Sequence, residues 1–466
     1  MSIATPASGP GPVSGIPQSL RHHVWQTLKL AGPVVIARSG VLIMMAVDTA
    51  MAGSAGGDEL AYFGLGLSPT IALTLLGLGF LLGVTVLTSQ ADGAGEPERA
   101  GHIWHVGLGH ALVVGTVFAI VCQFGVAILL ALGQAPDLAE GAGRVMHMLG
   151  WGLPAVMIFV ACSFFLEGVS RPAPGMIIML GANVLNFGLN WLLIHGNSVA
   201  GIAFSDAMGA EGAALATTLA RWATALIALT YIWFMPSRDR YRVRGGGPSA
   251  PEAGKRIRRI GYPMGLGMFI ETAAFMAMTQ MAGYLGKAEV AGYQIAHNLV
   301  ALVFMSAIGI GAATGVRVGN AVGRNDAHGV RMAGGVGVGL VIVAMILLGA
   351  CFVLIPDLLT GLYTSDAAVA ATAIGALAVA SSMMIFDGSQ GVLVNALRGL
   401  GDVWFPMAGQ FVAFWLIATP VAWMLAFHME FGTPGLMGGI YAGCVAATTI
   451  AAFRFNVISR RPLRRL

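Results

Sequence analysis

The stretch MMIFDGSQGVLVNALRG (residues 383–399) places a carboxylate, Asp387, between four apolar residues and a long run of small and apolar ones. The composition of the whole chain indicates whether this acid lies in water, in a protein core or in a membrane. Of the 466 residues, 57% are hydrophobic and 10% are charged, against about 25% charged residues in an ordinary soluble domain. The mean hydropathy is +0.79. We therefore infer an integral membrane protein in which Asp387 lies inside a spanning helix.

Twelve segments are long and apolar enough to cross a bilayer, because a spanning helix needs about 20 mostly apolar residues. This pattern predicts an all-α protein with two sets of six spans. The predicted spans are 24–52, 61–90, 102–132, 146–168, 173–196, 209–234, 257–285, 290–316, 331–356, 369–398, 404–428 and 434–456.

The basic residues gather in alternate connections between these spans. The largest groups are in residues 236–259 and in the tail RRPLRRL (460–466). Because cytoplasmic loops carry the excess of Lys and Arg, we expect both termini to be cytoplasmic in a multi-pass protein of the bacterial inner membrane. Arg38 and Arg221 lie inside predicted spans, and this topology does not account for them.

The two halves of the chain resemble each other at an offset of about 230 residues. LAGP (30–33) aligns with IGYP (260–263), and MAG (51–53) aligns with MAG (281–283). Six spans is an even number, so the copies share one orientation and a pseudo-two-fold axis along the membrane normal, with a substrate site between them. The predicted organisation is a disordered cytoplasmic tail (1–20), an N-terminal six-helix bundle (21–235), a basic cytoplasmic linker (236–259), a C-terminal six-helix bundle (260–456) and a basic cytoplasmic tail (457–466).

Other functional classes find little support in the sequence. The four cysteines and ten histidines have no metal-ligand or disulfide spacing, and no catalytic cluster is apparent, so we expect neither an enzyme nor a cofactor. The basic residues follow the topology, so we expect no nucleic-acid partner. A channel is disfavoured because Glu271 and Asp387 have no acidic counterparts at the repeat offset. Two halves form a cavity without a partner chain, so we expect a functional monomer.

Three acids lie well inside predicted spans: Asp48, Glu271 and Asp387. Each costs about 2.5–3.5 kcal/mol near the bilayer centre, so such residues usually face a cavity and bind something. At 1.5 Å per residue, Glu271 lies about 18 Å past Arg259, near the midplane. Asp387 lies at a similar depth, whereas Asp48 lies nearer the outer end. The alternative for each acid is a hydrogen-bonded role in packing only.

Two carboxylates in one apolar cavity do not both stay ionised without cost. We therefore expect Glu271 and Asp387 to take up H+ or to bind Na+ between them, and to attract an organic cation. Asn186 and Asn190 are four residues apart and share a helix face, so they either line a cavity near Asp48 or bond neighbouring helices. The candidate lining residues near the other two acids are Met268, Phe275, Gln280 and Met383, for which simple packing is the alternative.

Several of these stretches resemble the multidrug and toxic compound extrusion (MATE) family, in its NorM-like branch. LAGPVVIARSGVLIMMAVDTAMAG (30–53), GANVLNFGLNWLLI (181–194) and FDGSQGVLVNALRGLGD (386–402) resemble helices 1, 5 and 10. Residues 270–298, followed by GVRVGNAVG (315–323), resemble helices 7 and 8. The resemblance implies a V-shaped antiporter of two six-helix bundles that exports organic, often cationic, compounds in exchange for Na+ or H+.

The resemblance also implies roles for particular residues. The cation-coupling acids of helices 7 and 10 match Glu271 and Asp387, and the helix 1 aspartate matches Asp48. Asn190 stands where the DinF-like branch has an aspartate, which favours the NorM-like branch. Met383 replaces a frequent tyrosine, and Arg38 replaces an uncharged polar residue. The alternative function is a flippase or exporter of a lipid-linked compound or specific metabolite, for which we would expect a strongly basic central cavity.

Overall fold

The computed structural model describes residues 20–194, 196, 198–199, 202–203, 207–245 and 251–466. Apart from Leu20, the expected disordered tail lies outside these residues, as does part of the expected linker. The first half contains α1 (Leu20–Ala55), α2 (Gly57–Gly93), α3 (Pro97–Gln123), α4 (Gly125–Ala131), α5 (Pro136–Gly150), α6 (Leu153–Gly168), α7 (Ala173–Ile194), a hairpin of β1 (Ser198–Val199) and antiparallel β2 (Ile202–Ala203), and α8 (Gly209–Phe234).

The second half repeats this order of long helices. It contains α9 (Pro251–Leu285), α10 (Lys287–Gly323), α11 (Ala327–Leu354), α12 (Pro356–Gly361), α13 (Ala367–Gly399), α14 (Trp404–Phe411), α15 (Thr419–Trp423) and α16 (Gly432–Ile458). The π-helical segment Val412–Ala418 joins α14 to α15, and a second one, Met424–His428, follows α15 and extends this long span to His428.

The twelve expected spans correspond to helices of the structure. Ten helices of the described chain are long and apolar enough to cross a membrane, and α5 with α6, bent by 42°, makes an eleventh. The twelfth is α9, whose 35 residues include a basic first part and Glu271, which lower its hydropathy. This confirms the expected all-α architecture of two six-helix bundles.

The repeat is visible in the backbone as well as in the sequence. Gly56 and Gly286 have φ of 148° and 129° in the tight breaks after α1 and α9, and 286 − 56 = 230. A positive φ of this kind needs glycine. The Glu59 carboxylate accepts from the Ala210 backbone N–H at the start of α8 (2.6 Å), and Glu289 accepts from the Thr433 N–H at the start of α16 (2.8 Å).

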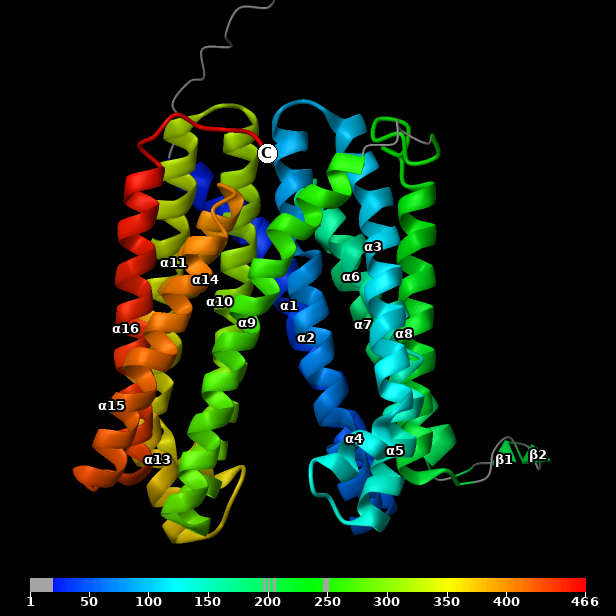
Figure 1. Cartoon of the computed structure of the whole chain (residues 1–466), viewed down its shortest axis with the longest axis vertical. Coiled ribbons are helices and arrows are strands. Elements are labelled where there is room, and N and C mark those ends of the chain that lie inside the picture. Colours follow the sequence, from blue (N-terminus) through cyan, green and yellow to red (C-terminus); the bar gives the residue numbers. More distant parts are fainter. Residues whose placement is uncertain (1–19, 195, 197, 200–201, 204–206, 246–250) are drawn as a thin grey trace, which may run out of the picture.

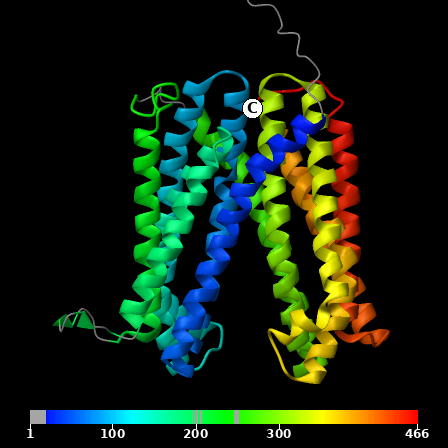
Figure 2. The same ribbon diagram turned by 180° about the vertical axis from the view of Figure 1, so that it is seen from behind.

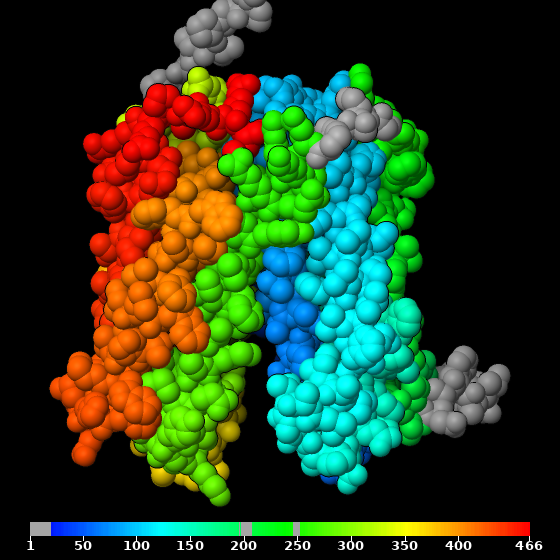
Figure 3. Space-filling model, viewed as in Figure 1, coloured from blue at the N-terminus to red at the C-terminus, as the bar shows by residue number. Residues whose placement is uncertain are grey.

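The two bundles form a V. Figure 1 and Figure 2 show α9 and α1 as long diagonals on opposite faces, with the halves joined near the chain's C-terminus and parted at the far end. The space-filling view in Figure 3 shows the split between α9 and the N-bundle. One large apolar core lies mainly in the C-bundle and takes in Ala31 of α1, and the other lies mainly in the N-bundle and takes in Ile260 and Met264 of α9. The two cores therefore also pack across the region where the bundles join.

We call the joined region, where α1 and α2 meet α9 and α10, the seam. Here a Cβ on Gly79 would lie 2.2 Å from the Gly265 Cα, so the absence of side chains lets the two backbones touch. Two side-chain amides, which are 230 residues apart in the sequence (320 − 90 = 230), form hydrogen bonds across the seam, and we call this pair the clamp. Gln90 Nε2 donates to the Gly399 carbonyl (2.9 Å), and Asn320 Nδ2 donates to the Ser170 hydroxyl (3.2 Å).

The expected linker is shorter than the sequence indicated. Helix α9 begins at Pro251, so residues 251–259 are its first turns, in keeping with a proline and Glu252 at its start. Tyr241, in the turns before it, donates its hydroxyl to Asp92 Oδ1 of α2 (3.1 Å). Burial and the neighbouring Asp92 charge raise the pKa of Tyr241 to about 12. The linker is thus anchored on the N-bundle.

Candidate functional site

In the N-bundle, Asp48 lies among polar side chains from two neighbouring helices, α7 and α8. Asp48 lies on α1 and is 2% exposed. Asn190 Nδ2 of α7 donates to its Oδ1 (2.6 Å), and the Thr217 hydroxyl of α8 donates to its Oδ2 (2.7 Å). Asn190 also donates to Asn186 Oδ1 one turn away (3.2 Å), as expected for residues four apart on one face. The structure therefore brings Asp48, Asn186 and Asn190 together.

Two residues of α8 complete this N-bundle site. Thr217 was missed from the sequence, where its only signal was a hydroxyl on an otherwise apolar span. Arg221 lies one turn beyond Thr217, and its Nη1 donates to the Leu149 carbonyl (3.4 Å). Its charge and that of Asp48 attract each other. Arg221, unexplained by the topology, is therefore a neighbour of the N-bundle acid.

The C-bundle holds the other two acids. Glu271 of α9 is partly exposed, and its two oxygens accept from Gln390 Nε2 of α13 (3.0 Å) and Gln410 Nε2 of α14 (2.9 Å). Gly267, one turn before Glu271, makes room for this contact, because a Cβ there would lie 2.7 Å from Gln410 Oε1. Asp387 of α13 is 4% exposed and accepts a weak bond from the Cys444 thiol of α16 (3.6 Å).

Glu271 and Asp387 belong to one site. Gln390 follows Asp387 by three residues on α13, so it lies on the same face and links that helix to Glu271. The two carboxyl groups are close enough for their charges to repel. Among the described residues, none of Asp48, Glu271 and Asp387 forms a salt bridge.

Each acid site also contains an amide oxygen that lacks a protein partner. Asn190 Oδ1 beside Asp48 and Gln390 Oε1 beside Glu271 are both buried and accept no hydrogen bond. Carboxylate and amide oxygens are the ligands that hard cations take. Within the described part of the chain, no three His, Cys, Asp or Glu residues gather as a metal site. A cation between Glu271 and Asp387 would therefore rest on two carboxylates and glutamine amides.

Comparison with known proteins defines the family. The MatE family model matches residues 33–192 and 263–424, one stretch in each half. The chain belongs to the MatE family. A protein named "Probable multidrug resistance protein NorM" from Caulobacter vibrioides is 33% identical over 94% of this chain and 92% of its own length. The resemblance to the NorM-like branch is thereby confirmed.

Solved structures of the MatE family have the same fold. The crystal structure of the eukaryotic MATE transporter AtDTX14 has a TM-score of 0.83 at 21% identity, covering 94% of this chain and 96% of that one. An outward-facing conformation of a multidrug resistance MATE family transporter has a TM-score of 0.84 at 20% identity, covering 94% and 97%. These relatives are transporters rather than enzymes.

The residues expected to line the cavity of this MatE-family protein have different surroundings. Phe275 packs in the C-bundle with its ring centroid 5.8 Å from that of Phe414. Met268 is half-buried and Gln280 is exposed, both on α9. Met383 is 1% exposed and lies inside the C-bundle core in this conformation, so its contact with a cavity stays a prediction. Helix α13 is central to its bundle, so a residue one turn from Asp387 is enclosed by neighbouring helices.

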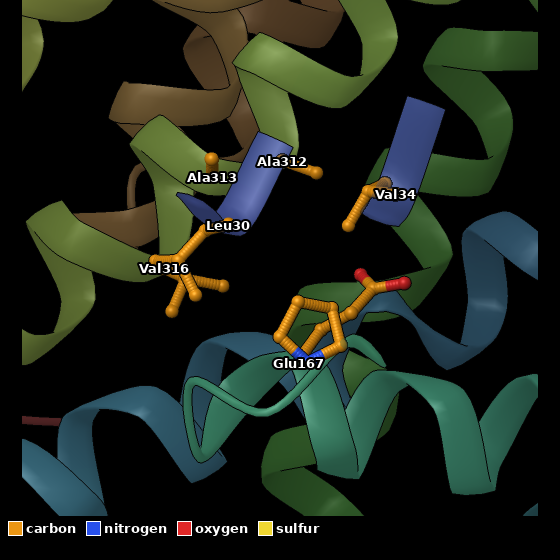
Figure 4. Close-up of a pocket in the computed structure, with 7 residues that line it drawn as sticks. Leu30, Val34, Glu167, Ala312, Ala313 and Val316 are labelled. Atoms are coloured by element: carbon orange, nitrogen blue, oxygen red, sulfur yellow. The ribbon is translucent and has the colours of Figure 1, made fainter. Parts of the chain in front are cut away.

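Arg38 has a partner within the N-bundle. Its Nη2 lies 3.5 Å from Glu167 Oε1 of α6, and its guanidinium lies 5.4 Å from the Phe164 ring centroid. It forms no salt bridge with Asp48 and instead contacts a neighbouring helix. Figure 4 shows Glu167 beside a small pocket that Leu30 and Val34 of α1 line together with residues of α10. The Arg38–Glu167 pair thus lies at the seam, away from the acid sites.

Proposed function

We propose that the protein is a secondary active antiporter that exports organic, often cationic, compounds in exchange for Na+ or H+. One observation carries this proposal. Glu271 and Asp387 share a site within the C-bundle in which Glu271 has amide partners and neither acid forms a salt bridge, while the Arg398 charge on α13 attracts Glu271 from further away. Such a site favours binding of a cation or a proton, and its charge depends on whether one is bound. The drug resistance named for the NorM relatives supports multidrug efflux.

Exchange follows from competition for the same negative charge. With no ion bound, the two carboxylates attract an organic cation into the space between the two bundles. Binding of Na+ between Glu271, Asp387 and Gln390 Oε1, or protonation of a carboxylate, neutralises that charge and weakens the hold on the drug. This exchange works in the same way with Na+ or with H+ as the coupling ion. The ion that enters the site thus releases the drug.

The conformation gives the exchange a direction. The bundles are closed at the end that carries the C-terminus and the basic linker, and open at the other end. If that basic end is cytoplasmic, as the distribution of Lys and Arg favours, this conformation opens outward from the bacterial inner membrane. Ions then enter and drug leaves on the outer side. Opening of the seam would return the ion to the cytoplasm and load the next drug.

The N-bundle site has a second part in the proposal. Asp48 is buried, accepts hydrogen bonds from Asn190 and Thr217, and has the Arg221 charge nearby, so its negative charge is partly compensated within the N-bundle. We propose that Asp48 also takes part in coupling. A flippase of lipid-linked compounds is not favoured, since the polar sites between the helices are acidic.

The test is drug transport in proteoliposomes under separately imposed Na+ and H+ gradients. We expect one gradient to drive efflux in the wild type, and Asp387→Asn to abolish it. Asp357→Asn is the matched control, because Asp357 is an exposed acid in the first turn of α12 in the same bundle. Coupled efflux that persists in Asp387→Asn would refute the coupling role. Transport driven by neither gradient would refute the antiport function, and lipid flipping would be assayed next.

A further inference from the structure

A groove on the membrane-facing surface lies outside the acid sites. It has a volume of about 510 Å³ and is bounded by α3 of the N-bundle and α9 of the C-bundle, with Phe80 of α2 between them. Figure 3 shows this face, where α2 (blue) is visible between α9 (green) and α3 (cyan). The groove therefore joins the two bundles on the lipid side of the seam.

The groove has one apolar wall and one aromatic wall. On α3, Val113 and Val117 line it and are 62% and 51% exposed, which is an unfavourable position in water and a favourable one beside an acyl chain. Opposite, the Tyr262 ring of α9 lies 4.7 Å from the Phe80 ring and 5.8 Å from the His110 ring, centroid to centroid. The walls are thus suited to a hydrocarbon chain.

One end of the groove is basic. A Cβ on Gly254 would lie 3.3 Å from Arg258 Nη1 and 3.5 Å from Val106, which places the guanidinium at the start of the α3 wall. Arg258 is exposed, and no acid lines the groove. Within the described chain no carboxylate pairs with Arg258, whereas Arg256 pairs with Glu252 (3.3 Å). A free guanidinium beside an apolar groove matches the two parts of an anionic lipid.

The length of the groove agrees with the depth of one leaflet. Val106 and Val117 are eleven residues apart on α3 (117 − 106 = 11), which is about 16 Å at 1.5 Å per residue. Half of the hydrocarbon thickness of a bilayer is about 15 Å. With Arg258 at the headgroup level, an acyl chain along these valines would end near the midplane.

We propose that this groove binds one anionic phospholipid from the leaflet on the basic side of the protein, with its phosphate on Arg258 and one acyl chain against Val113 and Val117. Guanidinium groups bind phosphate oxygens through paired charge-assisted hydrogen bonds. The lipid touches α3 in one bundle and α9 in the other. It therefore acts as a structural ligand of the conformation in which these helices enclose the groove.

The test titrates the delipidated full-length protein in detergent with phosphatidylglycerol or with phosphatidylcholine of the same chains. Bound lipid is counted by native mass spectrometry. We expect one phosphatidylglycerol to bind more tightly than phosphatidylcholine. Arg258→Gln should weaken phosphatidylglycerol about fivefold or more, from about 1 kcal/mol per basic residue facing an anionic lipid. Arg259→Gln, the adjacent exposed cation outside the groove lining, should change it less than twofold.

A second variant tests the acyl part of the site. Val113→Trp fills the groove from an exposed position and should weaken both lipids without loss of folding. Equal effects of Arg258→Gln and Arg259→Gln would overturn the proposal in favour of general charge attraction. Equal binding of the two lipids would overturn the phosphate contact. Displacement of phosphatidylglycerol by a cationic drug, with drug binding lost in Val113→Trp, would assign the groove to drug instead.

Discussion

The clamp at the seam offers the sharpest test of how the V is held in this conformation. Gln90 of α2 is 3% exposed and serves both bundles. Its Nε2 donates to the Gly399 carbonyl (2.9 Å), and its Oε1 accepts from the Leu466 backbone N–H (2.9 Å). Arg99 of α3 also donates to the Leu466 carbonyl (2.5 Å). Gln90→Ala removes two bonds that cross the seam and keeps the helix.

The size of the effect follows from these bonds. A typical hydrogen bond contributes about 0.5–1.5 kcal/mol net, so losing two destabilises the closed seam by about 1–3 kcal/mol. At 1.4 kcal/mol per tenfold change, the ratio of seam-closed to seam-open molecules should fall by a factor of about 5 to 140. A change of this size produces a measurable fraction of seam-open molecules if the free energies of the two conformations differ by a few kcal/mol.

The assay is a distance distribution between spin labels at the open ends of the arms. Leu132 at the end of α4 and Tyr284 on α9 are 67% and 77% exposed, so labels there should be tolerated. The four native cysteines are replaced, with Cys444→Ser to keep a donor for Asp387. We expect Gln90→Ala to move population from the long, open distance to a shorter one, because opening the seam closes the arms.

Two further amide variants serve as comparisons for the effect of Gln90→Ala on the distance distribution. Asn320→Ala removes the single bond of the pseudo-symmetric clamp and should give a smaller shift than Gln90→Ala. Gln123→Ala removes a bond within α3, to the Ala119 carbonyl, and should give none. If Gln90→Ala matches Gln123→Ala in its distance distribution, these contacts do not hold the seam and the reasoning is refuted.

Three other expectations concern the N-bundle acid, the helix crossing and the linker. Asp48→Asn should abolish coupled transport in proteoliposomes at normal yield; transport kept with lower yield would leave Asp48 a packing role only. Gly79→Ala should destabilise the protein by about 1–3 kcal/mol by forcing α2 from α9, whereas Gly64→Ala, which meets nothing within 4 Å, should not lower the melting temperature. The raised pKa of Tyr241, about 12, means that the unfolded tyrosine ionises first. The free energy of unfolding should therefore fall as pH rises from about 10 to 12, and less so in Tyr241→Phe, as measured by denaturation across that range.

Hydropathy and spacing along the chain were enough to predict the spans and the repeat, and they also predict the depth of Asp48, Glu271 and Asp387 in the bilayer. These properties add up along the chain: hydropathy over about 20 residues decides a span, and 1.5 Å per residue converts position into depth. Where one helix is concerned, spacing also suffices. Asn186 and Asn190 share a face because they are four residues apart, and the structure finds them bonded.

The contacts between side chains of different helices could not be predicted from the sequence. Thr217 and Gln410 look like ordinary polar residues in apolar spans, yet they bond Asp48 and Glu271. Met383 is enclosed in the C-bundle core, and Arg38 turns to Glu167. Each outcome depends on the rotation of one helix against another, which is set by the close packing of many small residues at once. Hydropathy carries no information on that rotation, so position along the chain predicts the depth of a charge in the bilayer, whereas the packing of the bundle determines which residues that charge contacts.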